Sequence, residues 1–397
     1  IDEEGFKEEM AEQKRKAREA LKGRESSAWA QDTHAGLAKD IKTEFVGYSE
    51  VQSDSKIVYI IKDDSIVESA GEGEQVTIIL DKTPFYAESG GQVGDTGYIE
   101  APTGIVRVED CKKAGDGNHL HYGIVEKGFI ESGSEVKAKI NVRRRMAIAR
   151  NHTATHLLHK ALRNVLGDHV NQAGSLVEPD RLRFDFTHFS AMTYEELKKV
   201  ENEVNSKILD NLTVSTEEMD IETAKKQGAT ALFGEKYGDV VRVVKIGDYS
   251  MELCGGTHLG ATSQAGFIKV LGESGVAAGV RRIEALTGEA ALKYFNEREA
   301  LLNEVAAALK TSPQDTLKRI EALHTDIKNA EKEIEQLRSK LVSSSIDDVL
   351  SKAVEIKGIK VAIARFDQLD LEALRNTGDV IKNKLGSGVV VLASAYG

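Results

Sequence analysis

The chain has 397 residues, a length that predicts two to four domains, and its hydrophobic fraction of 41% is ordinary for a globular protein. Its net charge of −11 argues against a generally basic nucleic-acid-binding protein, although a local basic surface remains compatible with it. No apolar run approaches the ~20 residues that a membrane-spanning helix needs, so we expect no membrane partner.

Two features of the chain bear on its location. The cysteines, Cys111 and Cys254, are too few for a disulfide framework and suit a reducing compartment. The first residues do not form a basic, apolar leader, so we expect a cytoplasmic protein. The chain starts without Met, and Gly397 follows an apolar strand-like run, so we also expect that both ends are cuts in a longer chain.

The first 150 residues predict a helix followed by a sheet. Residues 1–40 read as a linker helix, with acidic residues at its start and basic residues later, and solvent exposure is favoured over a nucleic-acid contact. Residues 41–148 contain short β-type runs separated by Gly-rich turns, which predicts a small β-barrel. Within them, residues 83–92 are too rich in Gly and polar side chains for a strand, and predict either an ordered turn or the wall of a site.

A run of three consecutive arginines comes next. Arg143, Arg144 and Arg145, followed by Arg150, lead into an amphipathic helix predicted over residues 150–166. A charge run is usually a solvated face. Because this run adjoins the histidines discussed below, we also predict phosphate contacts for it.

The remaining residues predict three further parts. Residues 149–288 mix helices and strands, as an α+β core does, and Thr193 with Glu196 predicts a capping box at a helix start. Residues 289–345 carry a heptad seam, which predicts an antiparallel helical hairpin, with coiled-coil pairing of two chains as the alternative. Residues 346–397 alternate strand, helix and strand, as in a partial α/β domain. The predicted fold class is therefore α+β.

Two short motifs carry metal-binding chemistry. His152 and His156 are four residues apart, which places both imidazoles on one face of a helix. Cys254 and His258 are also four apart, but two glycines between them favour a loop. Together these pairs provide a donor set of three His and one Cys, which selects zinc over magnesium or calcium.

The role of such a metal stays open at this stage. Four protein ligands usually close a structural site, whereas a catalytic site needs an open position. The two helix histidines lie near a helix start beside arginines, where an anion is favoured, and Gly255 and Gly256 would let backbone N–H groups approach a substrate closely. These neighbours suit zinc-assisted hydrolysis of a substrate attached to a polyanion. The competing hypothesis is a Cys254 nucleophile with His258 as its base, but this leaves the other histidine pair unused.

Several segments closely resemble the editing region of the bacterial-type alanyl-tRNA synthetase family. They are residues 151–159, 233–237, 252–258 and 274–285. Residues 83–95 are similar to the β-barrel before that region, and residues 384–392 to the opening of the family's C-terminal domain. The family's aminoacylation domain, with its ATP and alanine sites, has no counterpart, so the resemblance implies that this chain does not charge tRNA and that ATP serves only a full-length parent.

The resemblance implies a proofreading hydrolase that removes serine or glycine from the acceptor end of mischarged tRNA(Ala). A pocket built for alanine cannot strongly exclude slightly smaller or larger side chains, so a second site must correct errors. By resemblance, Thr155 contacts the serine hydroxyl and Gln172 lines the catalytic pocket. One Zn²⁺ per chain would be held by His152, His156, Cys254 and His258. The C-terminal part would hold tRNA or join two chains as a homodimer.

Two alternatives remain. One is a free-standing protein of the same superfamily that edits tRNA in trans. The other is a zinc-stabilised module that binds tRNA or dimerises without hydrolysis, with the helical hairpin as its interaction surface.

Overall fold

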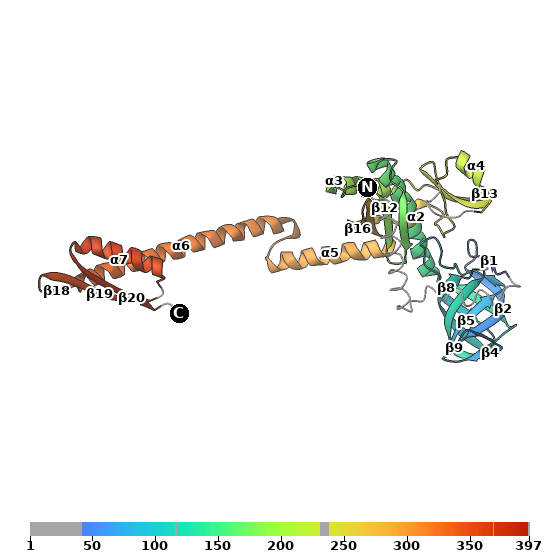
Figure 1. Cartoon of the computed structure of the whole chain (residues 1–397), viewed down its shortest axis with the longest axis horizontal. Coiled ribbons are helices and arrows are strands. Elements are labelled where there is room, and N and C mark those ends of the chain that lie inside the picture. Colours follow the sequence, from blue (N-terminus) through green and yellow to red (C-terminus); the bar gives the residue numbers. More distant parts are fainter. Residues whose placement is uncertain (1–41, 116, 231–237, 368, 396–397) are drawn as a thin grey trace, which may run out of the picture. The chain divides into compact units, whose positions relative to one another are not determined.

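The computed structural model describes residues 42–115, 117–230, 238–367 and 369–395 (Figure 1). The predicted linker helix and the resemblance at residues 233–237 lie outside these ranges. The chain divides into two compact units between Asn296 and Glu297. Among the described helices, none is long and apolar enough to cross a bilayer.

The first part of unit 1 is a six-stranded barrel, as predicted. Its strands follow the order β10-β7-β8-β9-β5-β2, and β10 pairs with β2 to close the ring. Short strands β3 (Ser65–Val67) and β4 (Ser69–Gly71) extend β2 and β9, and β1 (Glu44–Phe45) runs parallel to β6 (Lys82–Thr83). The barrel strands are β2 (Gln52–Lys62), β5 (Gln75–Leu80), β7 (Gly97–Glu100), β8 (Gly104–Lys113), β9 (His119–Glu131) and β10 (Glu135–Ile140).

The barrel closes around alternating apolar side chains. Ile57, Ile78 and Ile99 have no exposed surface and belong to one cluster inside it. Burying side chains of this size stabilises a fold by about 1.5–3 kcal/mol each. Residues 84–96, between β6 and β7, form a loop that contacts the next helix in sequence through Asp95 and Arg145.

Helix α2 (Val142–Leu166) begins eight residues before the predicted start of 150. The sequence reading missed its cap: the Asn141 side chain accepts a hydrogen bond from Arg144 N at 3.1 Å. The three consecutive arginines therefore occupy the first turn, where the helix dipole disfavours them. Contacts made by their side chains, described below, offset this.

Helix α2 packs on an antiparallel sheet with the order β11-β12-β17-β16. These strands are β11 (Gln172–Val177), β12 (Leu182–Thr187), β17 (Val280–Thr287) and β16 (Ile268–Ala277). Leu158, Phe184 and Ile283 are fully buried in the shared core. Helix α3 (Tyr194–Leu209) joins this core and has the predicted Thr193–Glu196 capping box.

A second, smaller sheet completes the α+β core. Strand β14 (Val240–Ile246) lies between β13 (Val214–Asp220) and β15 (Ser250–Leu253). Helix α4 (Ile221–Lys226) packs on it, and the 3-10 helix η1 (Thr262–Ala265) follows the loop after β15. This arrangement brings the end of β15 to the middle of α2.

Unit 2 contains α6 (Thr316–Ser351), which follows the 3-10 turn η2 (Pro313–Asp315), and a small α/β part. Helix α5 (Gly288–Ala308) spans the division between the units. In the α/β part, β19 (Ile359–Asp367) and β20 (Gly388–Ala395) are parallel, with α7 (Leu371–Leu385) between them in sequence, as predicted. Strand β18 (Val354–Ile356), which was not predicted, pairs antiparallel with β19.

The heptad seam of α6 is solvent exposed. Ile327, Ile334 and Leu341 have 56%, 51% and 69% of their surface accessible. The predicted packing of an antiparallel hairpin along this seam is therefore not observed, although the 3-10 turn at Pro313–Asp315 does divide this region into two helices. Pairing of the seam with a second chain stays a prediction.

Candidate metal centre and pocket

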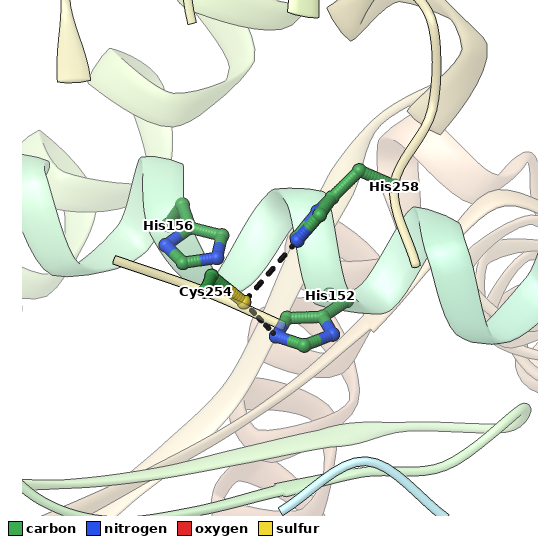
Figure 2. A group of neighbouring side chains, drawn as sticks. All are labelled: His152, His156, Cys254 and His258. Atoms are coloured by element: carbon green, nitrogen blue, oxygen red, sulfur yellow. Dashed lines mark hydrogen bonds between the residues drawn. The ribbon is translucent and has the colours of Figure 1, made fainter. Parts of the chain in front are cut away.

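Four side chains from α2 and the loop after β15 converge in unit 1 (Figure 2). Their ligand atoms all lie within 4.8 Å of one another. His152 and His156 stack one helical turn apart, with ring centroids 5.4 Å apart. Cys254 Sγ lies 3.3 Å from Nε2 of His152 and 3.3 Å from Nε2 of His258. This cluster can hold a metal ion.

The outer nitrogen of each imidazole has its own partner. His152 Nδ1 lies 2.7 Å from Gln92 Oε1, and His156 Nδ1 lies 2.8 Å from Glu252 Oε2. Both partner atoms are acceptors, so these Nδ1 atoms donate to them and leave the Nε2 atoms facing the cluster. Outer partners of this kind are what metal-binding histidines require.

The third imidazole follows the same pattern. His258 Nδ1 lies 3.2 Å from Thr153 Oγ1. At the centre of the cluster, the buried His156 Nε2 has no hydrogen-bond partner among the described residues. A buried nitrogen without a partner costs free energy unless something binds it, and a metal ion at this position would do so.

The charges in the cluster also favour a cation. Burial raises the pKa of the Cys254 thiol, but the surrounding imidazoles outweigh burial and hold that pKa well below its usual value. Burial lowers the pKa of His156, yet the Glu252 carboxylate and the Cys254 thiolate raise it to about 10. The site therefore contains two buried anions, the Cys254 thiolate and the Glu252 carboxylate. Their charge can be balanced either by a proton on His156 or by a bound metal cation. Burial keeps the pKa of His258 at about 3, so this ligand is neutral.

The loop between the two ligands Cys254 and His258 has little freedom. A Cβ on Gly256 would lie 2.0 Å from His152 Cε1, so only glycine fits there. Arg242 Nη1 donates to the carbonyl of Cys254 at 2.9 Å and to that of Gly256 at 2.8 Å. The Gly256 N–H donates to Cys254 Sγ at 3.4 Å. Glycine is thus required at position 256 for packing. The Gly256 N–H is hydrogen-bonded to the sulfur of Cys254, whereas the sequence predicts that it approaches a substrate.

A pocket of about 430 Å³ opens beside the cluster. Thr155 and Gln172, the two predicted pocket residues, both line it. Gly255 lines it too, and Tyr48 Oη donates to the Gly255 carbonyl at 2.6 Å. The barrel loop also contributes, which decides the open question about residues 83–92 in favour of a site wall. Lining residues from that loop are Tyr86, Ser89 and Gly90.

Two stretches of the chain match known protein families. Residues 1–144 match the family model described as tRNA synthetases class II (A), and residues 241–284 match that of the threonyl and alanyl tRNA synthetase second additional domain. The chain is 67% identical over 397 residues to the alanine–tRNA ligase of Acetivibrio thermocellus, covering 100% of this chain and 45% of that protein. It is 46% identical to the alanine–tRNA ligase of Bacillus subtilis, covering 99% of this chain and 45% of that protein.

The chain belongs to the alanyl-tRNA synthetase family. It spans less than half the length of the relatives that it matches. The second matched range contains Cys254 and His258, whereas the two histidines of α2 lie between the matched ranges. Within the first matched range, the described residues form the barrel and the first turn of α2.

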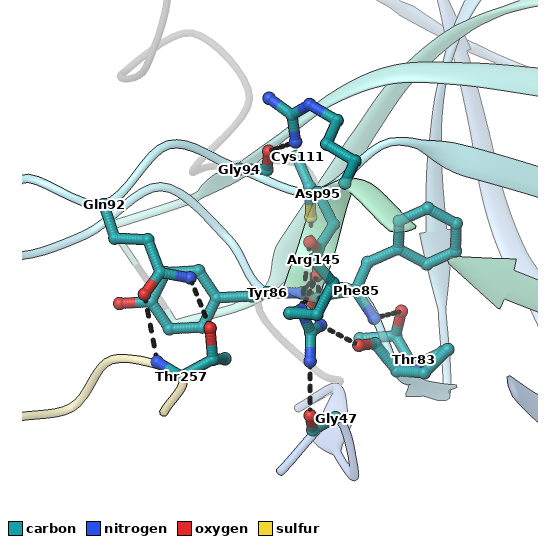
Figure 3. A network of polar contacts seen from close by, with 12 residues as sticks. Gly47, Thr83, Phe85, Tyr86, Gln92, Gly94, Asp95, Cys111, Arg145 and Thr257 are labelled. Atoms are coloured by element: carbon teal, nitrogen blue, oxygen red, sulfur yellow. Dashed lines mark hydrogen bonds and ion pairs between the residues drawn. The ribbon is translucent and has the colours of Figure 1, made fainter. Parts of the chain in front are cut away.

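The predicted phosphate-binding arginines of this family member do not form one patch. Arg145 is buried, with 6% of its surface exposed, and forms an ion pair with Asp95 of the barrel loop (Figure 3). Arg144 Nη1 donates to the Gly94 carbonyl at 2.6 Å. The prediction of a phosphate contact was therefore wrong for Arg145, because its guanidinium is inside the protein. Arg143 is exposed, and its pair with Glu289 is solvated.

Sequence reasoning missed several residues that shape the site. Glu252 holds His156, and its position on β15, two residues before Cys254, was the available signal. Gln92 lay within the loop that we flagged, but no periodicity distinguished it from its neighbours. Arg242 and Tyr48, whose ring lies 4.1 Å from the guanidinium carbon, carried no recognisable motif.

Proposed function

We propose that this pocket hydrolyses the ester bond of tRNA(Ala) mischarged with serine or glycine, with one zinc ion at the four-residue cluster. The observation that carries the proposal is that three of the four cluster residues, His152, His156 and Cys254, line the same cavity as Thr155 and Gln172. Thiolate and imidazole donors favour zinc. When bound, zinc would supply a Lewis acid for the ester carbonyl or for water.

Thr155 is suited to recognise a serine side chain. Its Oγ1 donates to the Asn151 carbonyl at 2.8 Å, so the hydroxyl proton is already used within the helix. The remaining lone pairs of this buried oxygen can accept a hydrogen bond from a hydroxyl in the pocket. Alanine has no hydroxyl to donate, so this contact favours release of serine over alanine; glycine, which also lacks a hydroxyl, does not use it.

The described lining residues include no carboxylate and no lysine. Among these described lining residues, the groups that could act as a general base are the histidines and the Cys254 thiolate, which the cluster already uses. The proposal accordingly assigns the chain's residues to binding and orientation. Gln172, which opens β11, lies with Thr155 on the pocket wall and would position the aminoacyl group.

The direct test is a deacylation assay with tRNA(Ala) carrying serine, glycine or alanine. We expect rapid release of serine and glycine and slow release of alanine. Equal and slow release of all three would reject the hydrolase and favour a zinc-stabilised binding or dimerisation module. A separate binding measurement with uncharged tRNA(Ala) distinguishes that module from an inert fragment.

Replacing Thr155 with Val should impair release of serine more than release of glycine. Loss of one hydrogen bond worth ~1.4 kcal/mol corresponds to about a tenfold lower rate for serine, while glycine has no hydroxyl to lose. The ratio of the two first-order rates is the measurement. Thr155→Ser retains the oxygen and serves as the matched control, and an unchanged serine-to-glycine ratio in Thr155→Val would contradict the assignment.

Arg143 and Arg150 remain proposed phosphate contacts. Arg143 pairs with Glu289 in solvent, an interaction worth little, so it can exchange that partner for a phosphate. Changing both arginines to Ala should lower the slope of log binding constant against log salt by about 2, since each phosphate contact contributes ~0.9. Arg107→Ala, which removes another exposed arginine with a carboxylate neighbour, is the control. A slope equal to the parent's would leave the two arginines as a solvated face.

A further inference from the structure

We infer that Gln92 of the β-barrel is a positioning residue for the metal centre, because its side-chain amide ties the two halves of the ligand set together. One half is the pair of histidines on α2, and the other is the loop from Cys254 to His258. The inference rests on the proposed metal-dependent function and assigns a role to a part of the chain that supplies no ligand.

The Gln92 side chain makes three hydrogen bonds at the cluster, and Figure 3 shows the two that it makes with Thr257. Its Oε1 accepts from His152 Nδ1 at 2.7 Å and from the backbone N–H of Thr257 at 3.0 Å. Its Nε2 donates to Thr257 Oγ1 at 2.9 Å. The backbone N–H can only donate, so the oxygen must face it, and this fixes the orientation of the amide. His152 must then donate from Nδ1 and keep Nε2 free for a metal.

The amide is itself held rigidly. Gln92 has no exposed surface. Its N–H donates to the Ser89 carbonyl at 3.0 Å, which closes the turn. Beyond the turn, Val93 N donates to the Val177 carbonyl at 3.2 Å, and Val177 N donates to the Gly91 carbonyl at 2.7 Å. The loop is thus joined to β11, the strand that starts with Gln172.

The other side of the loop is joined to α2. Asp95, three residues after Gln92, forms the buried ion pair with Arg145 on the first turns of the helix. Two anchors therefore fix the loop, one on β11 and one on α2. Gln92 lies between them and reaches the ligands.

This support differs from that of the other two histidines. His156 is held by Glu252 and His258 by Thr153, both from the α+β core that also supplies the ligands. His152 alone among the three ligand histidines depends on the barrel. The barrel therefore contributes to the metal centre. Loss of the Gln92 contact should lower the metal affinity even when the α+β core remains folded.

The experiment compares zinc affinity in the parent chain and in variants, by competition with a chromogenic chelator. Gln92→Met keeps a similar length and removes all three hydrogen bonds, and we expect its zinc affinity to fall about 10–100-fold, as for loss of other partners of ligand histidines. Gln92→Glu keeps the acceptor for His152 and should bind within about threefold of the parent. Gln75→Ala, an exposed glutamine on β5 of the same barrel, should not change the affinity. Melting temperatures with zinc and with chelator show that each variant is folded.

Parental zinc affinity in a folded Gln92→Met variant would overturn the inference. Equal weakening in Gln92→Met and Gln92→Glu would overturn it as well, because loop packing and not the acceptor would then be responsible. If Gln92→Met does not fold, Gln92→Asn decides in the same way, since its shorter side chain cannot reach both halves of the site. A parent chain that binds no zinc would instead reject the proposed function, so the two failures are distinguishable.

Discussion

Replacing Cys254 with Ala should abolish stoichiometric metal binding and reduce deacylation of Ser-tRNA(Ala) to the rate seen without protein. The thiolate is the only anionic ligand of the cluster, and it lies 3.3 Å from two ligand nitrogens. Its loss should cost more affinity than the ~10–100-fold caused by removing a partner of a ligand. Metal content per chain after gel filtration and the first-order deacylation rate are the two measurements. His152→Ala should behave in the same way.

The second cysteine provides the control for this variant. Cys111 is fully buried in the barrel, where burial raises the pKa of its thiol well above the usual value, so it is a protonated, apolar side chain. Cys111→Ala should retain one metal per chain and the parental deacylation rate. A Cys254→Ala chain that keeps its metal and its activity would contradict the assignment of Cys254 as a ligand of a catalytically required metal.

Replacing Arg145 with Met should destabilise unit 1 by about 3–5 kcal/mol, because it leaves the Asp95 carboxylate buried without its partner. Asp95 is 1% exposed, and Arg145 also donates to the Gly47 carbonyl at 2.7 Å and to the Pro84 carbonyl at 2.9 Å. The measurement is the free energy of unfolding in urea, followed by circular dichroism.

Arg107→Met is the matched substitution on the surface. Arg107 pairs with Glu109 at 2.5 Å, but both side chains are solvated, so we expect a change of no more than about 1 kcal/mol. The double variant Arg145→Met, Asp95→Leu removes the unpaired charge and should recover part of the lost stability. A loss of under about 1 kcal/mol in Arg145→Met alone would show that the buried pair does not hold the barrel to the helix.

The metal centre and the barrel show how far the structure could be predicted from the sequence. The spacing of His152 and His156 encodes a shared helix face, and the glycines before His258 encode a loop, so each half of the metal centre is a local property. That the halves meet is a property of the fold, which the sequence indicated only through the zinc-type chemistry of the combined donor set and through the family resemblance. The barrel strands were predictable from alternation, whereas the strand order that closes the barrel was not.

The arginine cluster shows the converse limit: residues that are adjacent in the sequence do not share one surface in the fold. Composition groups Arg143 and Arg145 into one basic run, but the helix turns them in different directions. Arg145 meets Asp95, which lies 50 residues earlier in the chain, and no local pattern joins the two. Gln92 was hidden for a similar reason, because its partners His152 and Thr257 lie 60 and 165 residues away. Polar residues with distant partners are where sequence reasoning failed.

Titrating zinc into the metal-free chain while following deacylation of Ser-tRNA(Ala) tests the central claim most directly. We predict that the rate rises in proportion to added zinc and reaches its plateau at one zinc per chain, with no rise in Cys254→Ala. A metal-free chain that hydrolyses the ester at the plateau rate would contradict the account, and would favour the Cys254 thiolate acting as a nucleophile beside His258.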